Sequence, residues 1–270
     1  MYNAASKLLT AMFVVAVASC GNSEKDQAMQ LCTAAEHEVT SGNYQAAVTL
    51  LDTLDVRYAS QVEVRRSAMK FRAMAVEGLT IRRICVVDDT LAVLKHNLEE
   101  AEPKFEYVAN PGKNLGGNYV ARSIAKLKNT DILPRVNDEG YFTLSVKIPG
   151  RSIGFSHLVF AEGSQSASTE AIAATRLVKV ENTEMTVLQQ EDVAPALEWL
   201  IAHPSAPTYE LVGSKTTIKN KFSENLREAM IETWLFAQNK QAYRLALIER
   251  EKLERKLQLC RDQLANVIDK

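Results

Sequence analysis

Two long stretches with helical periodicity constrain the fold of this chain more than any other feature. Residues 61–102 contain no proline and only one glycine, Gly78, and residues 223–267 contain neither. Apolar side chains step by three and four in both stretches: Ile84, Val87, Leu91, Leu94, Leu98 and Ala101 in the first, and Leu253, Leu257, Cys260, Leu264 and Val267 in the second. This spacing is typical of helices that pack along a coiled-coil seam.

Two helices of similar length, separated by a compact insertion, pair most simply in antiparallel fashion. The first has a clear start, because Ser60 and Glu63 form a capping box. The stretch "CVVDDT" is its weak point, since β-branched residues and two aspartates could divide it into two helices. Two alternatives to the pair stay open: each helix folds back on its own domain, or the last helix dimerises.

The intervening residues have the pattern of a β domain. In "YFTLSVKI", Phe142 to Ile148 alternate between an apolar and a polar face, after a turn that ends at Gly140. Further strands are expected in "GNYVARSIAKL", "SHLVFA", "TRLVKV", "EMTVLQQ" and "TYELVG", and one short helix in "EDVAPALEWLIAHP". The sequence therefore predicts an α+β fold, in which a long antiparallel helical pair carries an inserted antiparallel β-sandwich or partly open barrel of six to eight strands.

The first helical residues, 26–57, read as two short antiparallel helices joined by a turn at Gly42. Small, glycine, aromatic and apolar residues follow at offsets that resemble a tetratricopeptide repeat: Ala35, Gly42, Tyr44, Ala47, Leu51 and Leu54. Because no second convincing copy follows, the resemblance implies a repeat-like helical hairpin and not an array.

The N-terminus has the anatomy of a signal peptide. Lys7 precedes an apolar segment from Leu8 to Ala18, which is shorter than the ~20 residues of a membrane-spanning helix. The residues Val17-Ala18-Ser19-Cys20 resemble the lipobox of bacterial lipoproteins. An ordinary secretory signal and a coincidental cysteine are the alternatives.

The lipobox resemblance implies that Cys20 becomes an acylated N-terminus and that the membrane is a partner through this lipid. Because glycine follows the cysteine, it also implies an outer-membrane destination, on either face. The predicted division of the chain is a signal peptide at 1–19, a lipid-anchored tether at 20–25, a helical region at 26–102, a β domain at 103–218 and a long helix at 219–270.

Charge and cysteine content narrow the function classes. The formal net charge of -1 argues against a general polyanion binder, and we expect no nucleic-acid partner. Arginines and lysines cluster between residues 57 and 83, which is expected to be a solvated helix face. Beyond Cys20, the cysteines Cys32, Cys85 and Cys260 have no metal-ligand spacing and are expected to pack as small apolar side chains, with a Cys32–Cys85 disulfide as the alternative.

The motifs of common enzymes are missing from the sequence. The four histidines have no second ligand at metal spacing, "PGKNLGGN" lacks the ending of a phosphate-binding loop, and the serines of "EGSQSAST" have no nearby base. We therefore expect no catalytic activity, no metal and no cofactor.

Aromatic residues of the β domain are the candidate ligand-binding residues. Tyr119, Tyr141, Phe155 and Trp199, together with Tyr107, could line a sugar or peptide groove, although each ring is equally suited to a core. The sequence favours a lipid-anchored envelope protein that acts as a non-catalytic binding or assembly module, with its β domain presented on a helical stalk and another envelope protein as its partner. A glycan-binding or solute-binding accessory lipoprotein is the alternative.

Overall fold

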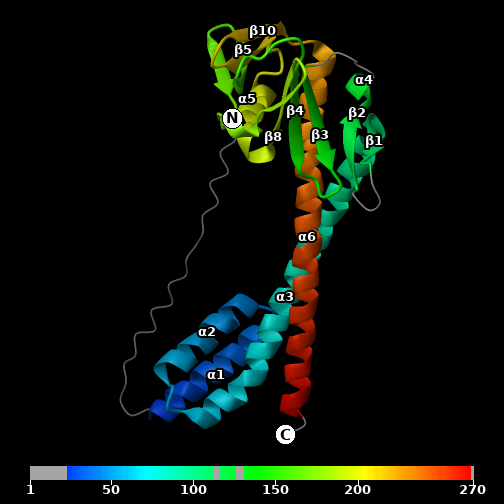
Figure 1. Ribbon diagram of the computed structural model, residues 1–270. Coiled ribbons are helices and arrows are strands. Elements are labelled where there is room, and N and C mark those ends of the chain that lie inside the picture. Colours follow the sequence, from blue (N-terminus) through cyan, green and yellow to red (C-terminus); the bar gives the residue numbers. More distant parts are fainter. Residues whose placement is uncertain (1–22, 112–115, 126–130, 269–270) are drawn as a thin grey trace, which may run out of the picture. The chain divides into compact units, whose positions relative to one another are not determined.

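A computed structural model describes residues 23–111, 116–125 and 131–268 (Figure 1). The predicted signal peptide and the predicted lipidation site Cys20 lie outside the described residues. The chain divides into two compact units, one up to Arg83 together with the residues from Leu253 onward, and one from Ile84 to Lys252. The fold class is α+β, as predicted, with short N-terminal helices, two long helices and two antiparallel sheets.

The first unit contains the predicted helical hairpin. Its helices are α1 (Glu24–Thr40) and α2 (Tyr44–Arg57), joined at Gly42 with a φ of 76°. The first half of α3 (Val62–Ala101) packs against both, and the buried residues include Ala35, Ala47, Leu51 and Leu54.

Gly78 of α3 provides the space for this packing. A Cβ atom placed there would overlap the ring of Tyr44, so any larger residue would collide with α2. The ring of Tyr44 also lies 4.8 Å below the guanidinium of Arg82, which donates a hydrogen bond to the carbonyl of Gly42.

The two long helices are α3 and α6 (Glu224–Ile268), and α3 runs through "CVVDDT" without a break. In the second unit, Arg250 of α6 pairs with Asp88 of α3 at 2.6 Å, and Lys104, just beyond α3, pairs with Glu232 at 2.7 Å. The earlier residue, Asp88, pairs with the later residue of α6, and Lys104 pairs with the earlier one. The two helices therefore run antiparallel in the second unit. Within the first unit, Arg261 lies 3.0 Å from Glu77.

The second unit holds all ten described strands, arranged in two antiparallel sheets. The six-stranded sheet has the order β1-β2-β3-β4-β8-β7, and the four-stranded sheet has the order β10-β9-β5-β6. Their bounds are β1 Phe105–Ala109, β2 Gly117–Ala121, β3 Ile132–Asn137, β4 Phe142–Ile148, β5 Phe155–Glu162, β6 Gln165–Ser168, β7 Val178–Val180, β8 Thr183–Gln189, β9 Thr208–Gly213 and β10 Thr217–Lys221. Short helical elements are η1 (Glu102–Lys104), α4 (Arg122–Ala125), η2 (Ala174–Arg176) and α5 (Gln190–Ala202).

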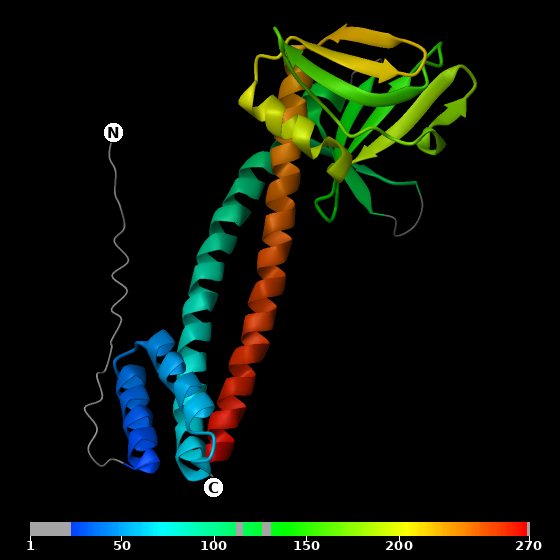
Figure 2. The ribbon, with the colours of Figure 1, turned by 90° about the vertical axis from the view of Figure 1, so that its left-hand side faces the viewer.

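One core joins the two sheets, α5 and the first half of α6 (Figure 2). We call the side of the six-stranded sheet that faces α6 its inner face. Phe142 contacts the ring of Trp234 there at 5.4 Å, and Phe105 stacks on Phe236 at 4.4 Å. The predicted alternation along β4 is confirmed, because Phe142, Leu144, Val146 and Ile148 are all buried.

Some local predictions are wrong. The segment "GNYVARSIAKL" is a strand only to Ala121, where α4 begins. The chain has ten described strands where six to eight were expected. Cys85 is exposed, because this part of α3 buries only the stripe that contains Val87, whereas Cys32 and Cys260 are buried as expected and all three thiols are free.

Candidate functional site

The solvent side of the six-stranded sheet, opposite α6, is the candidate binding surface, and we call it the outer face. It is formed by the side chains of β3, β4, β8 and β7 that point away from the core. Two cross-strand rows form its centre: Arg135, Thr143 and Gln189 in one row, and Leu133, Ser145 and Val187 in the next. A third row contains Lys147, Met185 and Val178.

The sequence folds this way because β3 alternates as strictly as β4 does. Ile132, Pro134 and Val136 are buried toward the core, so Arg135 and Asn137 lie on the opposite side. Leu133 alternates with them, but it is partly buried and packs against the core. Pro134 lacks a backbone N–H, and β2 pairs with β3 only at Val136 and Asn137, beyond the proline.

Arg135 is the unusual residue of this face. Its Nε atom is buried, yet it donates no hydrogen bond to any residue that the structure describes. A buried donor without an acceptor carries an unfavourable free energy of about 1–3 kcal/mol. Arg135 was not among the residues selected from the sequence, although the alternation in "ILPRVN" places it on the outer side.

Charge and exposure also distinguish the outer face. Its described residues include two cations, Arg135 and Lys147, and no acidic side chain. Val178, Val180 and Val187 expose 54%, 53% and 42% of their surface. The face therefore combines exposed aliphatic area with positive charge.

Tyr141 is the predicted site residue that borders this surface. It directly precedes β4 and is 51% exposed, and its backbone N–H donates to Asn137 Oδ1 at 2.8 Å within the turn that joins β3 to β4. Because Phe142 points into the core, Tyr141 lies on the outer side of the sheet.

Tyr119 lies on the inner side, in a cluster of rings on α6. Its ring contacts Tyr107 at 5.1 Å and Phe236 at 5.3 Å, and Lys240 Nζ lies 4.3 Å from its centroid. Burial lowers the pKa of Lys240, although the nearby carboxylates of Glu102 and Asp138 act in the opposite direction. This cluster holds β1 and β2 against α6.

Phe155 and Trp199 lie apart from the two tyrosines. Phe155 is a core residue with 2% of its surface exposed. Trp199 stacks on His203 at 4.1 Å near the end of α5, and His203 Nε2 lies 2.9 Å from Gln165 Oε1. These contacts connect α5 to the β5–β6 hairpin, so the four predicted rings do not form one groove.

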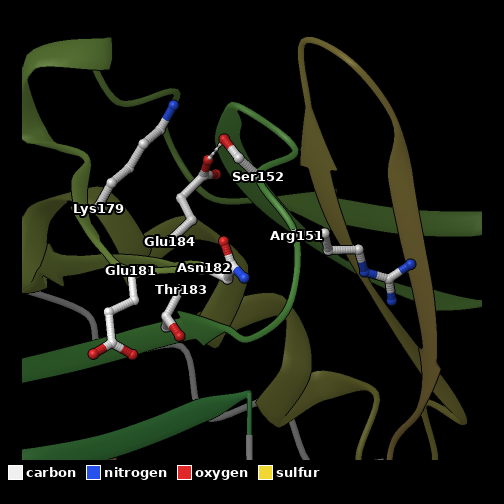
Figure 3. Close-up of a pocket in the computed structure, with 7 residues that line it drawn as sticks. All are labelled: Arg151, Ser152, Lys179, Glu181, Asn182, Thr183 and Glu184. Atoms are coloured by element: carbon white, nitrogen blue, oxygen red, sulfur yellow. Dashed lines mark hydrogen bonds between the residues drawn. The ribbon is translucent and has the colours of Figure 1, made fainter.

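A shallow hollow of about 100 Å³ lies beside the start of β8 and is lined by residues 151–152, 179 and 181–184 (Figure 3). Its deepest group is Glu184, which is 1% exposed. The carboxylate accepts hydrogen bonds from Ser152 Oγ at 2.6 Å, from the backbone N–H of Phe155 at 2.6 Å and from that of Gly154 at 3.1 Å.

Hydrogen bonds from the turn between β4 and β5 therefore already satisfy the carboxylate of Glu184. Burial raises its pKa, but the hydrogen bonds from Ser152, Phe155 and Gly154 outweigh burial, and the net pKa is lowered. Figure 3 shows that the side chain of Arg151 points away from the carboxylate, whereas the positive charge of Lys179 contributes to the lowered pKa of Glu184. Glu184 in this hollow thus has a structural role, because it holds the turn through which the chain passes from one sheet to the other.

The described residues contain no group of three histidine, cysteine or acidic side chains placed to hold a metal ion. None of the helices within the described ranges is long and apolar enough to cross a bilayer. Comparison with protein-family models, with curated proteins and with solved structures gave no match to this chain.

Proposed function

We propose that this chain is a lipid-anchored protein of the bacterial cell envelope, in the outer membrane, that acts as a non-catalytic binding or assembly module. Its outer face engages another envelope protein. The observation that carries this proposal is the combination of three half-exposed valines with two cations, Arg135 and Lys147, on one sheet face. Exposed apolar area that is contiguous with specific polar groups is typical of protein–protein contact surfaces.

A flat sheet face suits a protein partner better than a small ligand. Small molecules bind in concave pockets that enclose most of their surface. The outer face instead offers broad cross-strand rows, in which side chains of neighbouring strands present a continuous surface.

The lipid anchor is supported by the signal-peptide pattern and by Cys20 after Val17-Ala18-Ser19. Replacing Cys20 with serine should move the protein from the membrane fraction to the soluble fraction, because acyl chains can no longer be attached. Cys85→Ser is the matched control, since Cys85 is exposed and free on α3, and this variant should stay in the membrane. Membrane retention of Cys20→Ser would refute the anchor.

The binding role is tested by placing charge on the outer face. After cross-linking in intact cells, the wild-type protein should co-purify with a specific envelope protein, and Val187→Asp should lose it. Val56→Asp is the control, because Val56 is 81% exposed in the first unit. Equal recovery of the partner by both variants would rule out the outer face as the binding surface.

Glycan binding is the second candidate function. The observation that favours it is the half-exposed ring of Tyr141 at the border of the same face, since flat rings stack on sugars. A glycan-array signal that is abolished by Tyr141→Ala would favour this function over protein assembly.

A further inference from the structure

We infer that the turn between α2 and α3 contacts the surface of the phospholipid bilayer in which Cys20 is anchored. This inference rests on the lipid anchor of the proposed function, and it specifies which end of the first unit faces the membrane. We call the contact surface the anchor end. It consists of five exposed residues: Val56, Arg57, Ala59, Val62 and Arg66.

The first argument is the short length of chain between the lipid anchor and the fold. Helix α1 begins directly after its N-cap, Ser23, which is three residues beyond Cys20. Three residues span at most about 11 Å, so the start of α1 cannot lie further than this from the acylated residue. The bilayer surface is therefore close to the groups that lie beside the start of α1.

The α2–α3 turn lies beside the start of α1. The hydroxyl of Tyr58, the residue after α2, donates a hydrogen bond to Gln27 Oε1 in the first turn of α1, at 2.8 Å. Within the first unit, Figures 1 and 2 show the start of α1 and the start of α3 at the same end. The turn at Gly42 forms the opposite end of the hairpin. The short tether therefore brings the anchor end close to the bilayer.

The second argument is the exposed apolar area of the anchor end. Val56 is 81% exposed, which is the largest fraction among the large apolar side chains that the structure describes, and Val62 is 62% exposed. Neither belongs to the buried core of α1, α2 and α3. Arg57 follows Val56, and Arg66 lies one helical turn after Val62. An arginine at a bilayer surface can cover apolar area with its aliphatic stem and place its guanidinium on a headgroup phosphate.

Apolar contact contributes more than charge at this end. The exposed charged residues here are Lys25, Arg57, Arg66, Glu24 and Glu63. The three cations exceed the two acids by only one charge, so attraction to anionic lipid is weak. We therefore expect the valines to determine the contact, with only a small effect of added salt.

A bilayer fits this surface better than a second protein does. A stable protein interface buries about 1,200–2,000 Å², and two valines and an alanine are too small for such an interface. A contact beside an acylated cysteine needs much less area, because the anchor makes it intramolecular and so raises its effective concentration.

The test is photo-cross-linking of the full-length lipidated protein in vesicles of phosphatidylethanolamine and phosphatidylglycerol. A photoreactive residue is placed at Val62, in the anchor end, or at Asn43, which is exposed at the opposite end of the hairpin. Mass spectrometry identifies the cross-linked products. We expect a phospholipid adduct from position 62 and none from position 43.

Variants assign the contact to the exposed valines. Val56→Asp should lower the yield of the adduct from position 62 about tenfold or more, because burial of one valine side chain shifts an equilibrium by about this factor and anionic lipid repels aspartate. Ile81→Asp is the matched control, because Ile81 is 40% exposed and precedes Arg82, which contacts Gly42 at the other end. It should keep the wild-type yield. The melting temperature of Val56→Asp should match that of the wild type, which excludes loss of fold as the cause.

Three results would overturn the inference: equal phospholipid adducts from positions 62 and 43, a wild-type yield in Val56→Asp, or an adduct with a second copy of the protein in place of phospholipid at position 62.

The proposed function is judged by separate results. Val56→Asp keeps Cys20 and the outer face, so it should stay in the membrane fraction and recover the cellular partner. If Cys20→Ser leaves the membrane while position 62 gives no phospholipid adduct, the lipid anchor stands and the inference is wrong. If Cys20→Ser stays in the membrane, the proposed anchor itself fails.

Discussion

Glu184 joins the two sheets through a single carboxylate. The chain leaves the six-stranded sheet at the end of β4 and enters the four-stranded sheet at β5, and Glu184 of β8 binds the turn between them through Ser152, Gly154 and Phe155. An ionised acceptor is required, because three donors point at its two oxygens.

Stability should therefore depend on pH through Glu184. Its folded pKa lies below the unfolded value, so its contribution is complete above the unfolded pKa of about 4.3 and is lost as the pH falls through the folded pKa. Glu184→Gln should lower the free energy of unfolding by roughly 2–4 kcal/mol at pH 7. In urea denaturation, the difference between the variant and the wild type should shrink at acidic pH, and a difference that is constant with pH would contradict this role.

Substitution of Arg135 should have the opposite effect on stability, because its buried Nε has no acceptor among the residues that the structure describes. Arg135→Leu should leave the free energy of unfolding unchanged or raise it by about 1 kcal/mol. Arg176→Leu is the comparison, and it should lower stability by roughly 1–2 kcal/mol, because it strips Asp192 of a two-nitrogen contact. A large loss of stability in Arg135→Leu, measured by urea denaturation, would indicate a structural role for this arginine.

Among the helical elements, α2 and α3 depend on the contact between Gly78 and Tyr44. Gly78→Ala should destabilise the first unit by about 1–3 kcal/mol, since the new methyl group would overlap the ring, although alanine favours helix. The change should be largely neutral when Tyr44 is already alanine, because the ring is then absent. Met69→Ala, at an exposed position of α3, is the control. The coupling is measured by thermal unfolding of the wild type, Gly78→Ala, Tyr44→Ala and the double variant. If the destabilisations of the two single variants simply add in the double variant, the proposed contact is contradicted.

The spacing of apolar residues was sufficient to predict the long helices and β4. Apolar residues recur every three or four positions in the helices and at every second position in the strand. Residues 132–137 were not among the predicted strands, although they alternate as β4 does. β2 pairs with β3 only beyond Pro134, and the sequence does not show this pairing. The spacing also failed to identify Arg135 and Glu184 as special. Their character depends on which groups approach from distant strands, and a linear sequence does not contain that information.

Across the whole molecule, charge is distributed less evenly than the net value of -1 suggests. Several members of the basic cluster in residues 57–83 are compensated internally: Arg65 and Arg72 by Asp52 and Asp55, and Arg82 by the ring of Tyr44. These partly exposed pairs are consistent with the expected solvated helix face. On the outer face, no ion pair is described for Arg135 or Lys147, and the carboxylate of Asp131, across from Lys147, accepts a hydrogen bond from Asn220.

Site-specific photo-cross-linking in intact cells tests the proposed binding surface most directly. A photoreactive residue at Ser145, on the outer face, is compared with one at Thr217, which is exposed on the edge strand β10 of the other sheet. The account predicts a discrete cross-linked product from position 145, lost in the Val187→Asp background, and none from position 217. The same products from both positions, or none from position 145, would contradict it.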